Sequence, residues 1–392
     1  MNLESIQDAV RTAGVDGWLF VDFRRREPFA YDVLGVPAGT PARRWAYFVP
    51  ARGAARKILH RIEPRNLAAL PGEAVWYSTW SEWRSALGEL LAGSGTVAMQ
   101  YSPMCELPYL STVDAGTVEL VRSCGVKVVS SDRLVARFQG LIDGDQIETH
   151  RAASVLVHTA LADTFTLIRD RARSGDPITE RAAADFIERR FAELGLQPEG
   201  HGPNVSAGAN AANPHYDPPA VGSLPLTPGT PVLIDLWAKL KGDERAVVYD
   251  ITWCAWLGDT APPPEYVRRF DTVVRARDEA EALIRARYAA GEEVRGCDAD
   301  DACRAVVNLA GYGPHFTHRT GHAIDTRTHG GGVNLDNFES RDTRPLLPGA
   351  CFSIEPGIYE GIYGVRSEIN MLIDLAGNPQ TFGPKQSELL LL

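Results

Sequence analysis

Several common features are missing from this sequence, and each absence excludes a class of protein. The six cysteines of the 392-residue chain include no Cys-x-x-Cys pair, which argues against a disulfide framework or a zinc knuckle. No run of 18 apolar residues occurs, so we expect no membrane span. The first residues, MNLESIQDAVRTAG, lack the basic and apolar regions of a signal peptide. A cytoplasmic protein is therefore expected.

Positive charge is also scarce. The formal net charge is −10 and the isoelectric point is near 5.5, which argues against nucleic acid or an anionic membrane as the main partner. The 26 prolines and 36 glycines are scattered along the chain, so they predict turns in a folded protein and not disorder.

Three histidines lie close together in THRTGHAIDTRTHGGG, residues 317–332, although the whole chain has only nine. An HGGG sequence also occurs in esterases, which need a G-x-S-x-G nucleophile elbow as well. The chain has no such pentapeptide, and it has no H-E-x-x-H, Walker or Rossmann fingerprint. These absences exclude the esterase hypothesis.

Residues 1–145 predict a small α/β domain. Helical patterns such as residues 80–93 alternate with strand-like runs at residues 17–23, 44–50, 54–62, 74–80, 96–101 and 126–131. After residue 145 the pattern changes to long helices, one ending at Gly175 and another over residues 179–195 with Thr179 as a candidate N-cap.

The second region, residues 146–392, contains an internal repeat. Two further helical patterns end at Gly291 and Gly311, each 116 residues after the matching Gly175 and Gly195. Two units of helix, helix and strand in tandem predict a pseudo-twofold domain of α+β class.

Four carboxylates in this region lie in apolar, strand-like surroundings, where burial is costly unless the charge is paired or binds a cation: Asp235, Asp250, Glu355 and Glu368. Together with one imidazole they make a ligand set for two divalent cations, and oxygen-rich sites suit manganese, with cobalt or zinc as alternatives. Two such cations hold a bridging water, lower its pKa and polarise a carbonyl, which indicates a hydrolase.

The stretches LIDLWAK, VYDIT, HRTGHAIDTRTH, LLPGACFSIEPGIY and GVRSEI together resemble the pita-bread metallopeptidases, which include Xaa-Pro dipeptidases (prolidases), Xaa-Pro aminopeptidases and methionine aminopeptidases. The resemblance covers all of the second region and, more loosely, the first. It implies a C-terminal pita-bread domain of the creatinase/aminopeptidase type, residues 146–392, after a smaller α/β domain, residues 1–145.

The resemblance also implies roles for single residues. The metal ligands would be Asp235, Asp250, His322, Glu355 and Glu368, with Asp250 and Glu368 bridging the two ions. Glu355 would in addition act as general base.

Four further side chains match positions that act on the substrate or support the ligands. His215 would bind the substrate, His329 would steady the tetrahedral intermediate, and His318 would line the pocket. Arg366 would orient a ligand carboxylate.

One arginine bears on substrate choice, and at three places the sequence departs from the usual pattern of the family. Arg341, fourteen residues before Glu355, would clamp the substrate's terminal carboxylate, as in dipeptidases of this type. Asp235 and Asp250 are fifteen residues apart, where the family usually has eleven. Trp237 replaces a common glycine, and His201 occupies a position where relatives often carry a tyrosine.

The expected function is a dinuclear metal-dependent hydrolase that cleaves Xaa-Pro bonds with a metal-bridging water, as a Xaa-Pro dipeptidase acting on small peptides. The alternatives are a Xaa-Pro aminopeptidase for longer peptides and a non-catalytic pita-bread binding module. The complete set of five ligands favours catalysis over binding. By the same resemblance we expect a homodimer.

Overall fold

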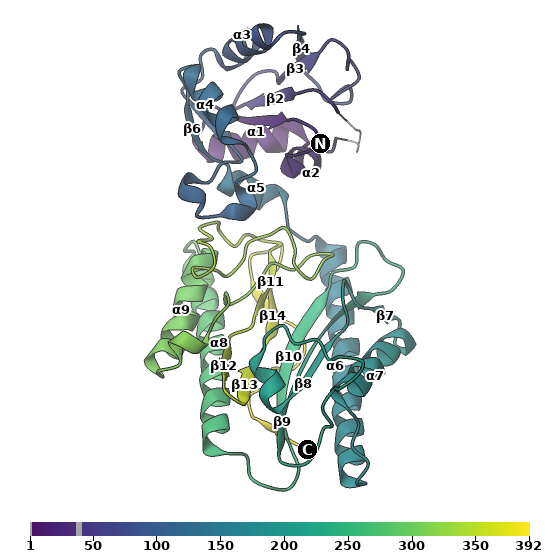
Figure 1. Cartoon of the computed structure of the whole chain (residues 1–392). Coiled ribbons are helices and arrows are strands. Elements are labelled where there is room, and N and C mark those ends of the chain that lie inside the picture. The colour runs from purple at the N-terminus through teal and green to yellow at the C-terminus, as the bar shows by residue number, and fades with distance from the viewer. Residues whose placement is uncertain (1, 37–40) are drawn as a thin grey trace. The chain divides into compact units, whose positions relative to one another are not determined.

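The computed structural model describes residues 2–36 and 41–392, which form two compact units that divide between Gln139 and Gly140 (Figure 1). The division lies slightly before the boundary expected after residue 145, which falls in the first turn of helix α6 (Gly144–Arg173). No helix of the described residues is both long enough and apolar enough to cross a membrane.

The N-terminal unit is built on a mixed sheet of order β4-β3-β2-β1-β5-β6. Alternate residues of β1 bury against opposite faces: Trp18 and Phe20 join one apolar cluster and Leu19 joins another. Every strand corresponds to one of the predicted runs: β1 Gly17–Asp22, β2 Trp45–Pro50, β3 Arg56–His60, β4 Glu73–Tyr77, β5 Thr96–Met99 and β6 Lys127–Ser130. The helices are α1 Leu3–Thr12, α2 Pro28–Leu34, α3 Trp80–Leu91, α4 Ala115–Ser123 and α5 Asp132–Phe138.

The C-terminal unit holds the repeated helix pairs, α6 with α7 (Glu180–Glu193) and α8 (Pro264–Ala290) with α9 (Gly296–Leu309). The glycines that follow these helices, Gly175, Gly195, Gly291 and Gly311, all have φ between 69° and 86°. Only glycine adopts this left-handed conformation without steric cost, so the 116-residue spacing repeats a structural position as well as a residue type.

Strands lie between the two helix pairs in this unit (Figure 1). The larger sheet has the order β16-β10-β9-β7, with β8 also paired to β9. Its strands are β7 Leu196–Gln197, β8 Asn204–Ala207, β9 Thr230–Leu240, β10 Tyr249–Leu257 and β16 Leu390–Leu391. The smaller sheets comprise β11 Cys351–Ile354, β14 Ile369–Ile373 and β15 Pro379–Thr381, and the hairpin of β12 Gly357–Glu360 and β13 Tyr363–Arg366.

The register of β9 and β10 sets the polar face of the larger sheet. The strands pair without interruption from Ala238 and Tyr249 to Thr230 and Leu257, so the four extra residues between the two aspartates lie in the connecting turn. Asp235 faces Thr252 and Trp237 faces Asp250 across the strands. Because side chains alternate along a strand, these four share one face, while residues such as Leu236 and Ile251 join the apolar core.

Candidate metal centre

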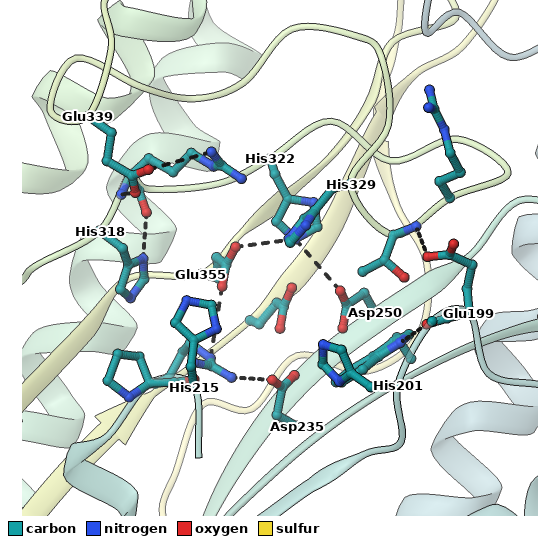
Figure 2. A pocket seen from close by; sticks show the side chains of 18 residues that line it. Glu199, His201, His215, Asp235, Asp250, His318, His322, His329, Glu339 and Glu355 are labelled. Atoms are coloured by element: carbon teal, nitrogen blue, oxygen red, sulfur yellow. Dashed lines mark hydrogen bonds and ion pairs between the residues drawn. The ribbon is translucent and has the colours of Figure 1, made fainter. Parts of the chain in front are cut away.

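A pocket of about 380 Å³ in the C-terminal unit brings together side chains from segments far apart in the sequence (Figure 2). Asp235 and Asp250 come from β9 and β10, and Glu355 and Glu368 lie directly after β11 and directly before β14. The three histidines come from the segment before β11: His318, His322 and His329. All eleven predicted site residues except Arg341 line this pocket: His201, His215, Asp235, Asp250, His318, His322, His329, Glu355, Arg366 and Glu368.

The centre of the pocket is a buried cluster of Asp250, His322 and Glu368, whose ligand atoms all lie within 4.8 Å of one another. The three residues are 4%, 4% and 2% exposed. His322 Nε2 lies 3.7 Å from Asp250 Oδ2 and 3.4 Å from Glu355 Oε1. Oxygen and imidazole ligands at this spacing suit a divalent transition-metal ion.

The carboxylates in this cluster lack the partners that burial normally demands. Within residues 2–36 and 41–392, Asp250 Oδ1 and Glu368 Oε1 are buried and have no hydrogen-bond partner. Burial, and then repulsion from neighbouring carboxylates, raises the pKa of both residues well above the ordinary value. A bound cation would satisfy the two oxygens and keep both groups ionised. The buried carboxylates of Asp250 and Glu368 therefore fit a site for a divalent metal ion.

Hydrogen bonds to Ser353 and Ala323 orient His322 as a metal ligand. Its N–H donates to Ser353 Oγ at 2.9 Å, and its Nδ1 lies 3.2 Å from the carbonyl oxygen of Ala323. We infer that Nδ1 carries the proton, which leaves the Nε2 lone pair directed to the cluster. Burial lowers the pKa of His322 to about 4, so the ring is neutral near pH 7. A Cβ on the preceding residue, Gly321, would lie 1.9 Å from the Ser353 carbonyl oxygen, which explains glycine there.

Asp235 joins the cluster through Thr252 and Arg366. Thr252 Oγ1 lies 3.0 Å from Asp235 Oδ1 and 2.8 Å from Glu368 Oε2, and it accepts a hydrogen bond from Arg366 Nε at 2.9 Å. Arg366 also forms an ion pair with Asp235. Burial raises the pKa of Asp235, and Arg366 opposes that rise. Thr252 was not among the predicted site residues, although its position two residues after Asp250 in a strand places it on the same face.

Glu355 reaches the pocket from the end of β11. Its backbone N–H donates to the Thr320 carbonyl oxygen at 2.7 Å, and its Oε1 accepts from Ser353 Oγ at 3.2 Å. Its Oε2 lies 3.9 Å from Arg366 Nε. The side chain is 15% exposed, so this carboxylate is held at the inner wall but remains open to the pocket.

The other histidines surround the cluster. His318 Nε2 lies 2.8 Å from the Tyr359 hydroxyl, and its Nδ1 lies 2.7 Å from the Arg319 carbonyl oxygen. The His329 ring is 4.5 Å from the His322 ring, at 87°. Burial lowers the pKa of both His318 and His329 to about 4, so both rings are neutral.

Arg341 is not among the residues that line this pocket, and its role in clamping the substrate stays a prediction. Arg341 is exposed, whereas the next residue, Asp342, is buried and accepts hydrogen bonds from Asn334 N at 2.9 Å and from Arg344. Arg319 lines the pocket and is only 16% exposed, with Nη1 3.7 Å from Glu339 Oε2. Arg319 follows His318 directly, but nothing in its local sequence distinguishes it from a surface arginine.

Comparison with known proteins matches this site to one family. The profile of metallopeptidase family M24 covers residues 148–374, which include all five expected ligands. The chain belongs to metallopeptidase family M24. It is accordingly a hydrolase, with the pita-bread fold of that family.

The relatives of this M24 metallopeptidase include peptidases for proline-containing substrates. The chain is 32% identical over 197 residues to a Xaa-Pro dipeptidase of Lactobacillus delbrueckii subsp. lactis, a match covering 49% of this chain and 47% of that protein. The match thus covers about half of each of the two proteins.

Solved structures share the fold over nearly the whole chain. Dipeptidase PepE from Mycobacterium ulcerans superposes with a TM-score of 0.65 at 22% identity, covering 99% of this chain and 96% of that one. An X-prolyl aminopeptidase from Caenorhabditis elegans, described as a cytosolic enzyme with a dinuclear active site, gives 0.59 at 17% identity, covering 97% of this chain and 61% of that one.

Proposed function

We propose that this M24 metallopeptidase is a Xaa-Pro dipeptidase that binds two divalent cations per chain. The observation that carries the proposal is the buried cluster of Asp250, His322 and Glu368, in which two carboxylate oxygens have no partner among the described residues. Such a cluster is costly for a fold unless cations occupy it.

Five side chains would hold the two ions: Asp235, Asp250, His322, Glu355 and Glu368. Asp250 and Glu368 lie at the centre and would be shared. Four of the five ligands are carboxylates, and an oxygen-rich set of this kind favours manganese, with zinc and cobalt as alternatives. When bound, two divalent cations supply Lewis acidity, which polarises a carbonyl and lowers the pKa of a water.

The chain's own groups would then manage protons and charge. Glu355 is open to the pocket and would take the proton of the attacking water as general base, while Ser353 and Arg366 keep its two oxygens in place. His329 is neutral and beside the cluster, so an N–H of its ring can donate to the oxygen that gains negative charge. His215 also lines the pocket and would contact the substrate.

The pocket favours a short substrate. Its volume of about 380 Å³ is near the lower end for ligand pockets, and it also has to contain the cations. Arg319 offers a mostly buried guanidinium for the terminal carboxylate of a dipeptide. Proline before that carboxylate fits because its imide bond lacks an N–H and fixes the backbone, so nothing in the pocket has to accept a hydrogen bond there.

A direct test compares two substrates on the same protein. Protein stripped of metal and reloaded with Mn²⁺ should cleave Ala-Pro faster than the tripeptide Ala-Pro-Ala, and Glu355→Ala should abolish both activities. Zn²⁺ and Co²⁺ are tested in parallel. Faster cleavage of the tripeptide would assign an aminopeptidase, and absence of bound metal together with absence of activation would indicate a binding module.

We also propose that the protein is a homodimer, as part of its likeness to family members. Size-exclusion chromatography with light scattering should give twice the chain mass of 42.7 kDa, and a monomer mass would contradict this proposal.

A further inference from the structure

We propose that Trp237 closes the end of the pocket that receives the N-terminal residue of the substrate, so that the protein selects dipeptides with a small first side chain. This inference rests on the proposed function, because it assigns a direction to a bound dipeptide.

The position of Trp237 beside the ligands follows from strand geometry. It lies two residues after Asp235 on β9 and directly opposite Asp250 on β10, so its indole shares the face that carries both carboxylates. The residue is 6% exposed and lines the pocket. The indole therefore occupies space next to the candidate metal ligands.

The indole is held in that position on two sides. Its Nε1 donates to the Glu199 carbonyl oxygen at 2.7 Å, and the His201 ring packs against it with centroids 4.9 Å apart at 85°. The Glu199 carboxylate in turn accepts a hydrogen bond from Thr328 N at 3.1 Å, in the segment that carries His329. Swinging the indole away would break these contacts together, so Trp237 acts as a rigid wall.

The two ends of the pocket differ in their arginines. Glu199 and His201 lie at one end and Glu339 and His318 at the other, with the metal cluster between them (Figure 2). Arg319 borders the end with His318, pairs with Glu339 and is 16% exposed. Arg366 is more deeply buried, at 5%, but is engaged by Asp235 and Glu355 beside the metal cluster. Arg327 is 58% exposed and pairs with Asp325, so water weakens its attraction.

A dipeptide would therefore place its terminal carboxylate toward Arg319 and its ammonium toward Asp235 and Glu199. Its first side chain then points to Trp237. A methyl group fits beside a fixed indole, whereas a leucine or phenylalanine side chain would overlap with it. Misfit on the scale of a methylene or more changes specificity by about tenfold to a few hundredfold.

The test measures kcat/KM for Ala-Pro, Leu-Pro and Phe-Pro with the wild-type protein and with Trp237→Ala, both loaded with Mn²⁺. The wild type should prefer Ala-Pro to Phe-Pro by at least about tenfold, and Trp237→Ala should reduce that ratio at least about tenfold. Trp237→Phe, which keeps an aromatic ring, should restore most of the preference.

Trp253→Ala is the matched control, because Trp253 is the neighbouring tryptophan on the other face of the same sheet and packs against His158. It should lose stability without changing the substrate ratio. An unchanged ratio in Trp237→Ala, or a wild type that cleaves Phe-Pro as readily as Ala-Pro, would overturn the inference.

Two further measurements separate this inference from the proposed function. Ala-Ala and Phe-Ala repeat the comparison without proline. Equally fast cleavage of these peptides would refute the Xaa-Pro specificity, but their ratio would still test whether Trp237 limits the first side chain. Calorimetric binding of Ala-Pro and Phe-Pro to the metal-free protein, with and without Trp237→Ala, needs no turnover. Equal affinities of the protein without the substitution for the two peptides would contradict the role of Trp237.

Discussion

Thr252→Val should weaken metal binding without disturbing the fold. The substitution keeps the branched shape of the side chain and removes only the hydroxyl, which lies 3.0 Å from Asp235 Oδ1 and 2.8 Å from Glu368 Oε2. Thr252 is fully buried, so no water replaces the lost contacts. Arg366 Nε also loses an acceptor at 2.9 Å.

The size of the effect follows from these contacts. A hydrogen bond to a charged group contributes about 1.5–3 kcal/mol, and loss of a group that orients a metal ligand typically costs about 10–100-fold in affinity or activity. Because the single hydroxyl proton is shared between two carboxylates, we use the lower half of the energy range. We therefore expect Mn²⁺ affinity to fall by about tenfold to thirtyfold, which is about 1.4–2 kcal/mol.

The assay is calorimetric titration of the metal-free protein with Mn²⁺, followed by activity as a function of metal concentration. Thr164→Val is the matched control, because Thr164 is equally buried but its hydroxyl donates only to the Ala160 carbonyl oxygen of its own helix, at 2.7 Å. Metal affinity of Thr252→Val within about twofold of the wild type would refute the role given to this hydroxyl.

Three more predictions follow from the structure. Gly321→Ala should lower both stability and metal content, since the added Cβ would lie 1.9 Å from the Ser353 carbonyl oxygen; normal metal content by elemental analysis would contradict this. Metal removal should lower the melting temperature, because the Asp250 and Glu368 carboxylates then stay buried without a partner; calorimetry showing an unchanged melting temperature would count against the metal site. Burial lowers the pKa of His150 to about 4, so the unfolded chain takes up a proton that the folded chain does not; its stabilising contribution is present above pH 6.5 and lost as the pH falls toward 4. His150→Gln should reduce the slope of unfolding free energy against pH in that window by up to about 1.4 kcal/mol per pH unit, and an equal slope in urea titrations would refute this.

Patterns along the chain predicted much of this protein. Asp235 and Asp250 stand out because each is a carboxylate inside an apolar strand, and burial without a partner is costly in any fold. The glycines at residues 175 and 291 mark equivalent helix ends because a left-handed residue after a helix is nearly always glycine. These inferences depend on a residue and its near neighbours, which is why a single sequence reveals them.

Contacts between distant segments could be decided only by the tertiary structure. Thr252 matters because Glu368, 116 residues away, lies within hydrogen-bond distance. Arg341 matched a spacing but is exposed and does not line this pocket, whereas Arg319, which has no distinctive sequence context, does. Trp237 was a departure of unknown consequence until the register with Asp250 and the contact with His201 placed it at one end of the site. Periodicity determines which face of its own element a side chain occupies, but the packing of elements determines what that face meets.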